Sequence, residues 1–180
     1  MSHLPGPTKS GIELSGVPQA FYRRNQPHLQ RDCKPHFLTF CTYQRWALPD
    51  WARTIVMDAS LRANGWTIDL RAVVVMPDHV HMIFTPLVDI AKSEVFSLAR
   101  ITKGIKGTSA HLINRQLGRP GRVWQEESFD RVLRVSEKLD EKTAYILDNP
   151  VRKGLASSPN EYRWLWVAAT PEPSFARLGR

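Results

Sequence analysis

Four stretches of the chain have the residue pattern of β-strands. Residues 36–42, HFLTFCT, are rich in aromatic and β-favouring side chains and predict the first strand. Residues 66–76, which end in the run VVVM, and residues 79–85, HVHMIFT, predict a hairpin with a Pro-Asp turn between its strands. A fourth strand, interrupted along its length, is expected at residues 124–135.

Other stretches carry apolar residues at the three- and four-residue spacing of an amphipathic helix. The expected helices span residues 49–65, 89–105, 108–117 and 137–149. Gly104 and Gly107 weaken the end of the second helix, so that the third is expected to begin separately, capped by Thr108 or Ser109. Pro150 is expected to stop the last helix, because its ring clashes with the preceding turn.

This order of elements predicts the fold class. Strands and helices are interleaved, but a hairpin lies in the middle, which fits an α+β fold of ferredoxin-like type. We expect an antiparallel sheet with the helices packed on one of its faces. Residues 1–18 are rich in Gly, Pro and Ser and predict a disordered N-terminal arm. Residues 170–180 predict a flexible basic tail, which leaves residues 19–169 as a single domain.

Charge adds the first indication of a partner. Lys and Arg total 25 against 17 acidic residues, for a formal net charge of +8 and a pI near 9.9. Such a balance favours a polyanion such as nucleic acid, although it also fits a protein that is merely soluble. No apolar run approaches the roughly 18 residues of a membrane span, and no signal peptide is evident. We therefore expect a cytoplasmic protein without a membrane partner, in which Cys33 and Cys41 are free thiols.

The pair His79 and His81 is the first candidate for chemistry. Residues two apart in a strand point to the same face, so both imidazoles are expected to project side by side. Two neutral imidazoles form a good partial site for a divalent metal. The alternative is that one or both histidines are hydrogen-bonded residues of the surface or the core.

Tyr145 and Asn149 form a second candidate pair, four residues apart on one face of the last expected helix. An amide oxygen can complete the coordination of a hard cation, and a tyrosine beside a metal can act as a nucleophile on phosphorus. Alternatively, Tyr145 packs at the boundary of helix and sheet, and Asn149 caps the helix before Pro150.

Taken together, these segments resemble a known family. The segment VVVMPDHVHMIF is similar to the histidine–hydrophobic–histidine strand of single-tyrosine transposases of the IS200/IS605 type. More closely, the chain resembles the REP-associated tyrosine transposases. The resemblance includes, in the order of that family, KGTSAHLINRQLGRPGRVWQ, SFDRVLR, YILDNPVRKGL and EYRWLW, and it covers residues 36–166.

The resemblance implies a role for each candidate and makes residues 19–169 a catalytic domain of HUH type. His79 and His81 match the paired metal ligands, and Tyr145 matches the nucleophile. Asn149 matches the third ligand, a position occupied by Gln in more distant relatives. The implied activity is metal-dependent cutting and rejoining of single-stranded DNA at REP-like hairpins through a 5′-phosphotyrosine, with Mg²⁺ or Mn²⁺ as the cofactor. Asp130 is expected in the shell around a histidine, and the protein is either a monomer or a homodimer.

Basic and aromatic residues offer contacts for the DNA. The candidate phosphate-binding residues are Arg23, Arg24, Arg100, Lys103, Lys106, Arg115, Arg119 and Arg122, although any of them can equally be a solvated surface charge. Trp46 precedes a turn and is the candidate for stacking on a base. Trp66 and Trp124 fall in expected strands and are assigned to the core.

Other functions remain open at this level. The first is a domesticated module that binds repeat DNA without catalysis. The second is a hydrolase in which water attacks in place of Tyr145, so that no covalent adduct forms. In a third interpretation both histidines are only packing residues.

Overall fold

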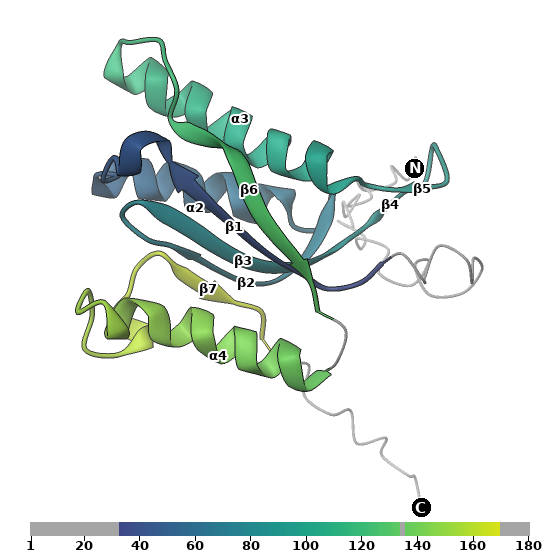
Figure 1. Cartoon of the computed structure of the whole chain (residues 1–180). Coiled ribbons are helices and arrows are strands. Elements are labelled where there is room, and N and C mark those ends of the chain that lie inside the picture. Colours follow the sequence, from purple (N-terminus) through teal and green to yellow (C-terminus); the bar gives the residue numbers. More distant parts are fainter. Residues whose placement is uncertain (1–32, 134–135, 170–180) are drawn as a thin grey trace, which may run out of the picture.

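A five-stranded antiparallel sheet of order β6-β1-β3-β2-β7 organises the protein. The structure is a computed structural model that describes residues 33–133 and 136–169 (Figure 1). The strands of the sheet are β1 (His36–Thr42), β2 (Ile68–Val75), β3 (His79–Pro86), β6 (Trp124–Val132) and β7 (Leu165–Val167). The helices are α2 (Asp50–Ala63), α3 (Leu98–Leu117) and α4 (Ser136–Arg152). Strands β4 (Val88–Asp89) and β5 (Glu94–Val95) pair with each other, and η2 (Tyr43–Arg45) and η3 (Pro159–Glu161) are short 3-10 turns.

Strand β3 lies at the centre of the sheet and pairs with both β1 and β2. Its register with β1 places Thr39 opposite His81 and Cys41 opposite His79. On its other side, Val74 of β2 lies opposite His81. The two histidines are therefore fixed by hydrogen-bonded neighbours on both sides, which is the most constrained position that a sheet provides.

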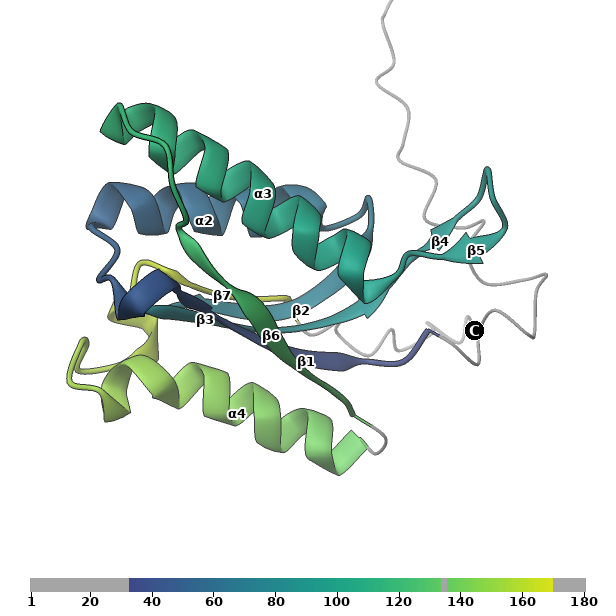
Figure 2. The ribbon, with the colours of Figure 1, turned by 45° about the horizontal axis from the view of Figure 1, so that its top comes forward.

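The helices cover both faces of the sheet. Helices α2 and α3 lie on one face and α4 lies on the other (Figure 2). On the first face, Phe40 packs edge-on against Trp124, whose indole nitrogen donates to Ser109 of α3. On the second face, His81 packs against Tyr145 of α4.

The antiparallel α+β fold is as predicted, but the helices do not share one face. The reason lies in the central strands, which are apolar on both sides. In β2, the run Ala72, Val73, Val74 and Val75 is fully buried, and so are successive residues of β3 from Val80 to Phe84 except for His81, which is 7% exposed. A strand buried on both faces needs cover on both faces.

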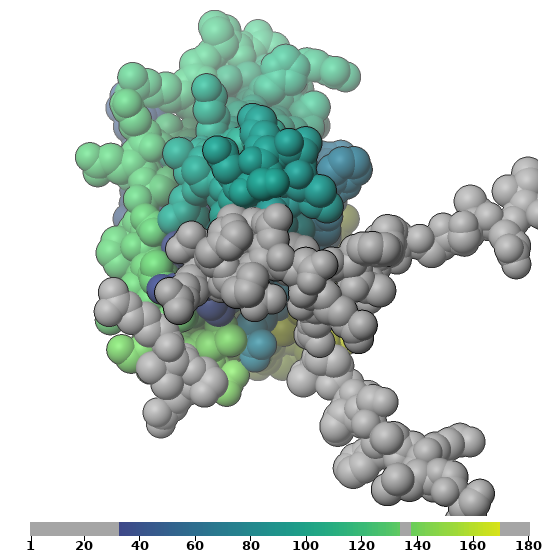
Figure 3. All heavy atoms as spheres, turned by 90° about the vertical axis from the view of Figure 1, so that its right-hand side faces the viewer, coloured from purple at the N-terminus to yellow at the C-terminus, as the bar shows by residue number. Residues whose placement is uncertain are grey.

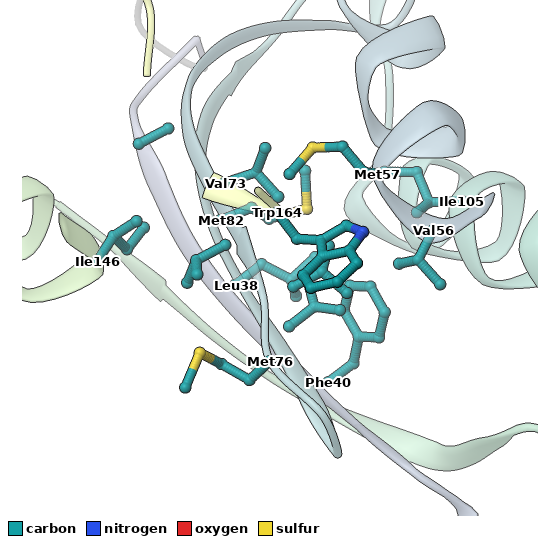
Figure 4. Packing of buried hydrophobic residues seen from close by; sticks show 14 of the residues in the cluster. Leu38, Phe40, Val56, Met57, Val73, Met76, Met82, Ile105, Ile146 and Trp164 are labelled. Carbon is teal, nitrogen blue, oxygen red and sulfur yellow. The ribbon is translucent and has the colours of Figure 1, made fainter. Parts of the chain in front are cut away.

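The larger part of the core fills the layer between the sheet and helices α2 and α3. Figure 4 shows Leu38, Phe40 and Met82 from the strands beside Val56 of α2 and Trp164. On the other side of these strands, Ile146 of α4 is completely buried. The two layers thus hold α4, and the residues it carries, at a fixed height over β2 and β3.

The segment from 87 to 117 differs from its expected structure. Residues 88–95 form the small β4–β5 hairpin, which projects at the end of the molecule that faces the viewer in Figure 3. Helix α3 then runs without a break, with Ser97 accepting a hydrogen bond from the Arg100 amide and Gly118 ending the helix at a φ of 61°. Gly104 and Gly107 are exposed and do not interrupt it, because the buried stripe of Ile101, Ile105, Ser109 and Ile113 continues past both.

Two further expectations also need correction, and one strand was missed. Pro150 lies inside α4, which continues to Arg152 instead of stopping. Trp66 is 81% exposed in the turn before β2, whereas Trp124 is buried as predicted. Strand β7 was not predicted, because its three residues are too few to show a pattern.

Among the described residues, no helix combines the length and the apolar character needed to cross a membrane. The N-terminal arm, the basic tail, Arg23 and Arg24 lie outside the described residues.

The continuity of α3 leads to a prediction. A Cβ added at Gly104 or Gly107 meets no atom within 4 Å. Replacing either by Ala should therefore raise the free energy of unfolding by about 0.5–1 kcal/mol, because Ala loses less backbone entropy in a helix. Urea unfolding followed by circular dichroism measures the change.

The matched control is Gly118→Ala. This position also has open space around it but a positive φ, so the substitution should lower the stability by about 1 kcal/mol. If Ala at 104 or 107 lowers the stability as well, α3 is not the single unstrained helix described above.

Candidate active site

His79 and His81 begin β3 directly after the turn at Pro77-Asp78. Their side chains leave the sheet on the face covered by α4, as the two-residue repeat predicts. The ring centroids lie 4.7 Å apart with the ring planes at 70°. The pair is largely enclosed, with 15% of the His79 side chain and 7% of residue His81 exposed.

One ring nitrogen of each histidine is held by a neighbour. His79 Nδ1 lies 2.6 Å from Asp78 Oδ1, and His81 Nδ1 lies 2.7 Å from Thr39 Oγ1. An ionised carboxylate only accepts hydrogen bonds, so Nδ1 of His79 carries a proton and donates it to Asp78. The Thr39 hydroxyl engages the same nitrogen of His81, and within residues 33–133 and 136–169 neither Nε2 atom has a hydrogen-bond partner.

Electrostatics keep this arrangement in place. Burial acts to raise the pKa of Asp78, but the hydrogen bonds and charges of His79 and Arg45 outweigh it and hold the pKa below its usual value. Arg45 donates to Asp78 Oδ2 over 3.1 Å. The carboxylate therefore stays ionised at neutral pH and remains an acceptor for His79.

His81 is neutral at physiological pH. Burial foremost, assisted by the positive potential of His79 and Lys142, lowers its pKa to about 3 against the opposing effect of Asp78. Neutral imidazole is the form that binds a metal, so no proton has to be displaced from this ring first. The donor chemistry and the free Nε2 atoms thus fit a divalent cation.

Helix α4 brings Tyr145 and Asn149 to the same face of the sheet. The Tyr145 ring is edge-on to His81, with the centroids 5.4 Å apart, and edge-on to Phe37 at 6.1 Å. The tyrosine is half-buried, and Asn149, one turn further, is 5% exposed. Because α4 continues to Arg152, Asn149 is not the helix cap that the sequence left open as an alternative.

The candidate donors predicted from the sequence are two imidazoles and one amide. Within the described ranges, no three His, Cys, Asp or Glu side chains gather in a group able to hold a metal. A cation beside the histidines would thus take its third protein ligand from another kind of side chain, such as the amide oxygen of Asn149.

The candidate DNA-binding residues do not converge on this site. All those described belong to α3 or to the turn after it, on the opposite side of the sheet from Tyr145 (Figure 2). Lys103, Arg115 and Arg122 are exposed, and Arg119 lies over the ring of Trp46 at 5.4 Å.

Two of these cations already have partners within the protein. Arg100 pairs with Asp89 at 3.1 Å. Lys106 Nζ donates to the carbonyls of Gln125 and Glu126 and to the Ser128 hydroxyl, at 2.7, 2.9 and 3.2 Å. Lys106 therefore ties α3 to the edge strand β6, and burial lowers its pKa.

The structure also moves one expected neighbour and adds others. Asp130 Oδ2 lies 3.8 Å from Nδ1 of His36, so the histidine beside it is neither His79 nor His81. Asp78 and Thr39 are the residues that contact the candidate ligands. Asp78 could have been found from its place beside His79, whereas Thr39 is identified only by the register of β1 with β3.

Comparison with known proteins places this geometry in context. No curated protein matches the chain. Among solved structures, one described as the REP-associated tyrosine transposase bound to a REP hairpin aligns with a TM-score of 0.61 and 20% identity. The alignment covers 74% of this chain and 76% of that one, and it shows a shared fold. A putative transposase from Deinococcus radiodurans R1 aligns less well, with a TM-score of 0.42 and 18% identity over 62% of this chain and 87% of the other.

The family model of IS200-like transposases matches residues 29–147. The match spans more than half of the chain and includes His79, His81 and Tyr145, while Asn149 lies just beyond its end. The chain therefore belongs to the family of IS200-like transposases.

Proposed function

We propose that this transposase cuts and rejoins single-stranded DNA through a covalent bond to Tyr145. One observation carries the proposal. The ring centroid of Tyr145 lies 5.4 Å from that of His81, and the Nδ1 atoms of His79 and His81 are both engaged by neighbouring side chains. A nucleophile beside a ready-made metal site is the arrangement that phosphodiester transesterification requires.

His79, His81 and Asn149 would hold Mg²⁺ or Mn²⁺. When bound, the metal neutralises charge on the scissile phosphate and helps to orient it. The protein's part is to keep the three ligands in position: β3 fixes the histidines, Asp78 and Thr39 set their ring orientation, and α4 supplies the amide.

Tyr145 supplies the nucleophile. Its phenol oxygen forms a bond to phosphorus while the bond from phosphorus to the 3′ oxygen breaks, which leaves a 5′-phosphotyrosine and a free 3′-hydroxyl. The proton lost by the phenol is balanced by the one gained by the leaving oxygen. Since one phosphodiester replaces another, the reverse attack by a 3′-hydroxyl rejoins DNA without an external energy source.

The net charge of the protein and the ligand of its structural relative support one class of substrate. The net charge of +8 suits a polyanion, and the relative with the same fold is described as bound to a REP hairpin. We therefore propose REP-like hairpins with a single-stranded flank as the DNA. The exposed cations of α3 would bind phosphates on the face away from Tyr145.

The first test concerns the covalent intermediate. Purified protein is mixed with labelled hairpin DNA from repeats that flank its own gene, with Mg²⁺, with Mn²⁺ or with a chelator. We expect a metal-dependent protein–DNA adduct on a denaturing gel. Tyr145→Phe should reduce the adduct at least about 1000-fold, because the phenol oxygen is the attacking atom.

The exposed Tyr43 provides the matched control, since Tyr43→Phe should leave the adduct unchanged. Cleaved DNA without an adduct would identify a hydrolase. Binding of the correct hairpin with neither cleavage nor adduct would leave a repeat-binding module and overturn the proposal.

The second test concerns the residues behind the histidines. Thr39→Val removes the hydroxyl that orients His81, and Asp78→Asn replaces the charged acceptor of His79 by a weaker, neutral one. Both should weaken Mn²⁺ binding about 10- to 100-fold. Isothermal titration calorimetry measures the Kd, with Thr85→Val, near the far end of β3 from the histidines, as the control. Unchanged metal affinity in both variants would refute the orienting role.

A further inference from the structure

Tyr145 lies between two cations of its own helix. Lys142, one turn before it, places its ammonium nitrogen 5.5 Å from the centre of the tyrosine ring and 5.7 Å from that of Phe37. The Arg152 guanidinium carbon lies 5.9 Å from the same tyrosine ring. No metal-ligand role and no DNA contact predicted from the sequence accounts for this arrangement.

The ammonium of Lys142 is available to a ligand. Its nearest acidic group is the Glu141 carboxylate at 3.8 Å, beyond good hydrogen-bonding distance, and the structure gives it no hydrogen bond within the described residues. Only 29% of the Lys142 side chain is exposed, against 70% for Glu141. An ammonium that is partly shielded from water interacts more strongly with an anion than one on an open surface.

Lys142 lies on the same side of the sheet as the histidine pair. Its ammonium and the His81 ring both lie against the rings of Phe37 and Tyr145, so its charge opposes any cation placed beside His81. A lysine there weakens the binding of a metal without substrate. A phosphate placed between the ammonium and the metal would remove this repulsion, because it attracts both.

We propose that Lys142 binds a non-bridging oxygen of the scissile phosphate and of the phosphotyrosine that follows. This inference rests on the function proposed above. As the bond from Tyr145 to phosphorus forms and the bond to the 3′ oxygen breaks, charge accumulates on the non-bridging oxygens, and a cation placed there lowers the barrier. Lys142 donates a hydrogen bond in this step and transfers no proton.

The experiment compares Lys142→Met with Lys142→Arg, in single-turnover cleavage of the same hairpin DNA. We expect the cleavage rate constant of Lys142→Met to fall about 10- to 100-fold. Lys142→Arg should stay within about threefold of the unaltered protein, because it retains the charge. Lys138→Met removes an exposed lysine one turn earlier on α4 and should leave the rate unchanged.

Metal affinity separates phosphate binding from a structural role. Without DNA, Lys142→Met should bind Mn²⁺ as tightly as the unaltered protein or more tightly, because a repelling charge has been removed. Loss of metal affinity together with the rate would show that Lys142 merely holds the site in shape and would overturn the inference.

A second substrate tests the contact itself. A neutral methylphosphonate in place of the scissile phosphate removes the charge that Lys142 meets. On this DNA the difference between Lys142→Met and the unaltered protein should shrink to about twofold or less. An equal loss on both substrates would contradict the inference.

The outcomes distinguish the two proposals. An adduct in the unaltered protein together with a normal rate in Lys142→Met overturns only the role of Lys142. No adduct in the unaltered protein, on DNA that it binds, overturns the proposed function and the role of Lys142 with it.

Discussion

The pairing of β3 with β1 and β2 is the constraint on which the site depends. It places two histidines in the middle of the sheet and sets Thr39 opposite His81. A shift of one residue in this register would turn both imidazoles to the layer of α2 and α3, away from Tyr145. The buried run of β2 resists such a shift, because every one of its side chains from Ala72 to Val75 has a place in the core.

Burial serves both stability and chemistry at this point. The packing that encloses His81 between Phe37 and Tyr145 also removes its ability to carry a proton near neutral pH. The cost of burying a polar ring is offset by the Thr39 hydroxyl. His79 is held by the Asp78 carboxylate instead, and that carboxylate is itself anchored by Arg45. The two imidazoles are thus held through the same ring nitrogen by different neighbours.

Much of this could be predicted from the sequence, and the exceptions have physical causes. The bounds of β1 and the hairpin of β2 and β3 follow from local pattern, and so does the shared face of His79 and His81. The placement of α4 on the opposite face from α3 does not, because it depends on both sides of the central strands being buried. Thr39 was missed for a similar reason, since its neighbour His81 is distant in sequence. Lys142 lies one turn from Tyr145 on the same helix, but its contact with Phe37 crosses the layer between sheet and helix and has no sign in the sequence. The predicted break at Gly104 and Gly107 and the predicted helix end at Pro150 are wrong, because tertiary packing outweighs the helix propensities of single residues.

The three hydrogen bonds of Lys106 have a consequence for how the protein meets a polyanion. Its ammonium donates to carbonyls of β6, and Arg100 pairs with Asp89. The pair adds nothing to the formal charge of +8, because that sum already subtracts Asp89. Lys106 counts in the sum, but its hydrogen bonds within the protein compete with any contact to a phosphate backbone. The salt dependence of the binding affinity measures how many phosphates the protein neutralises. It does not measure how many basic residues the protein contains. Counting lysines and arginines on α3 would therefore overstate the electrostatic part of its affinity for DNA.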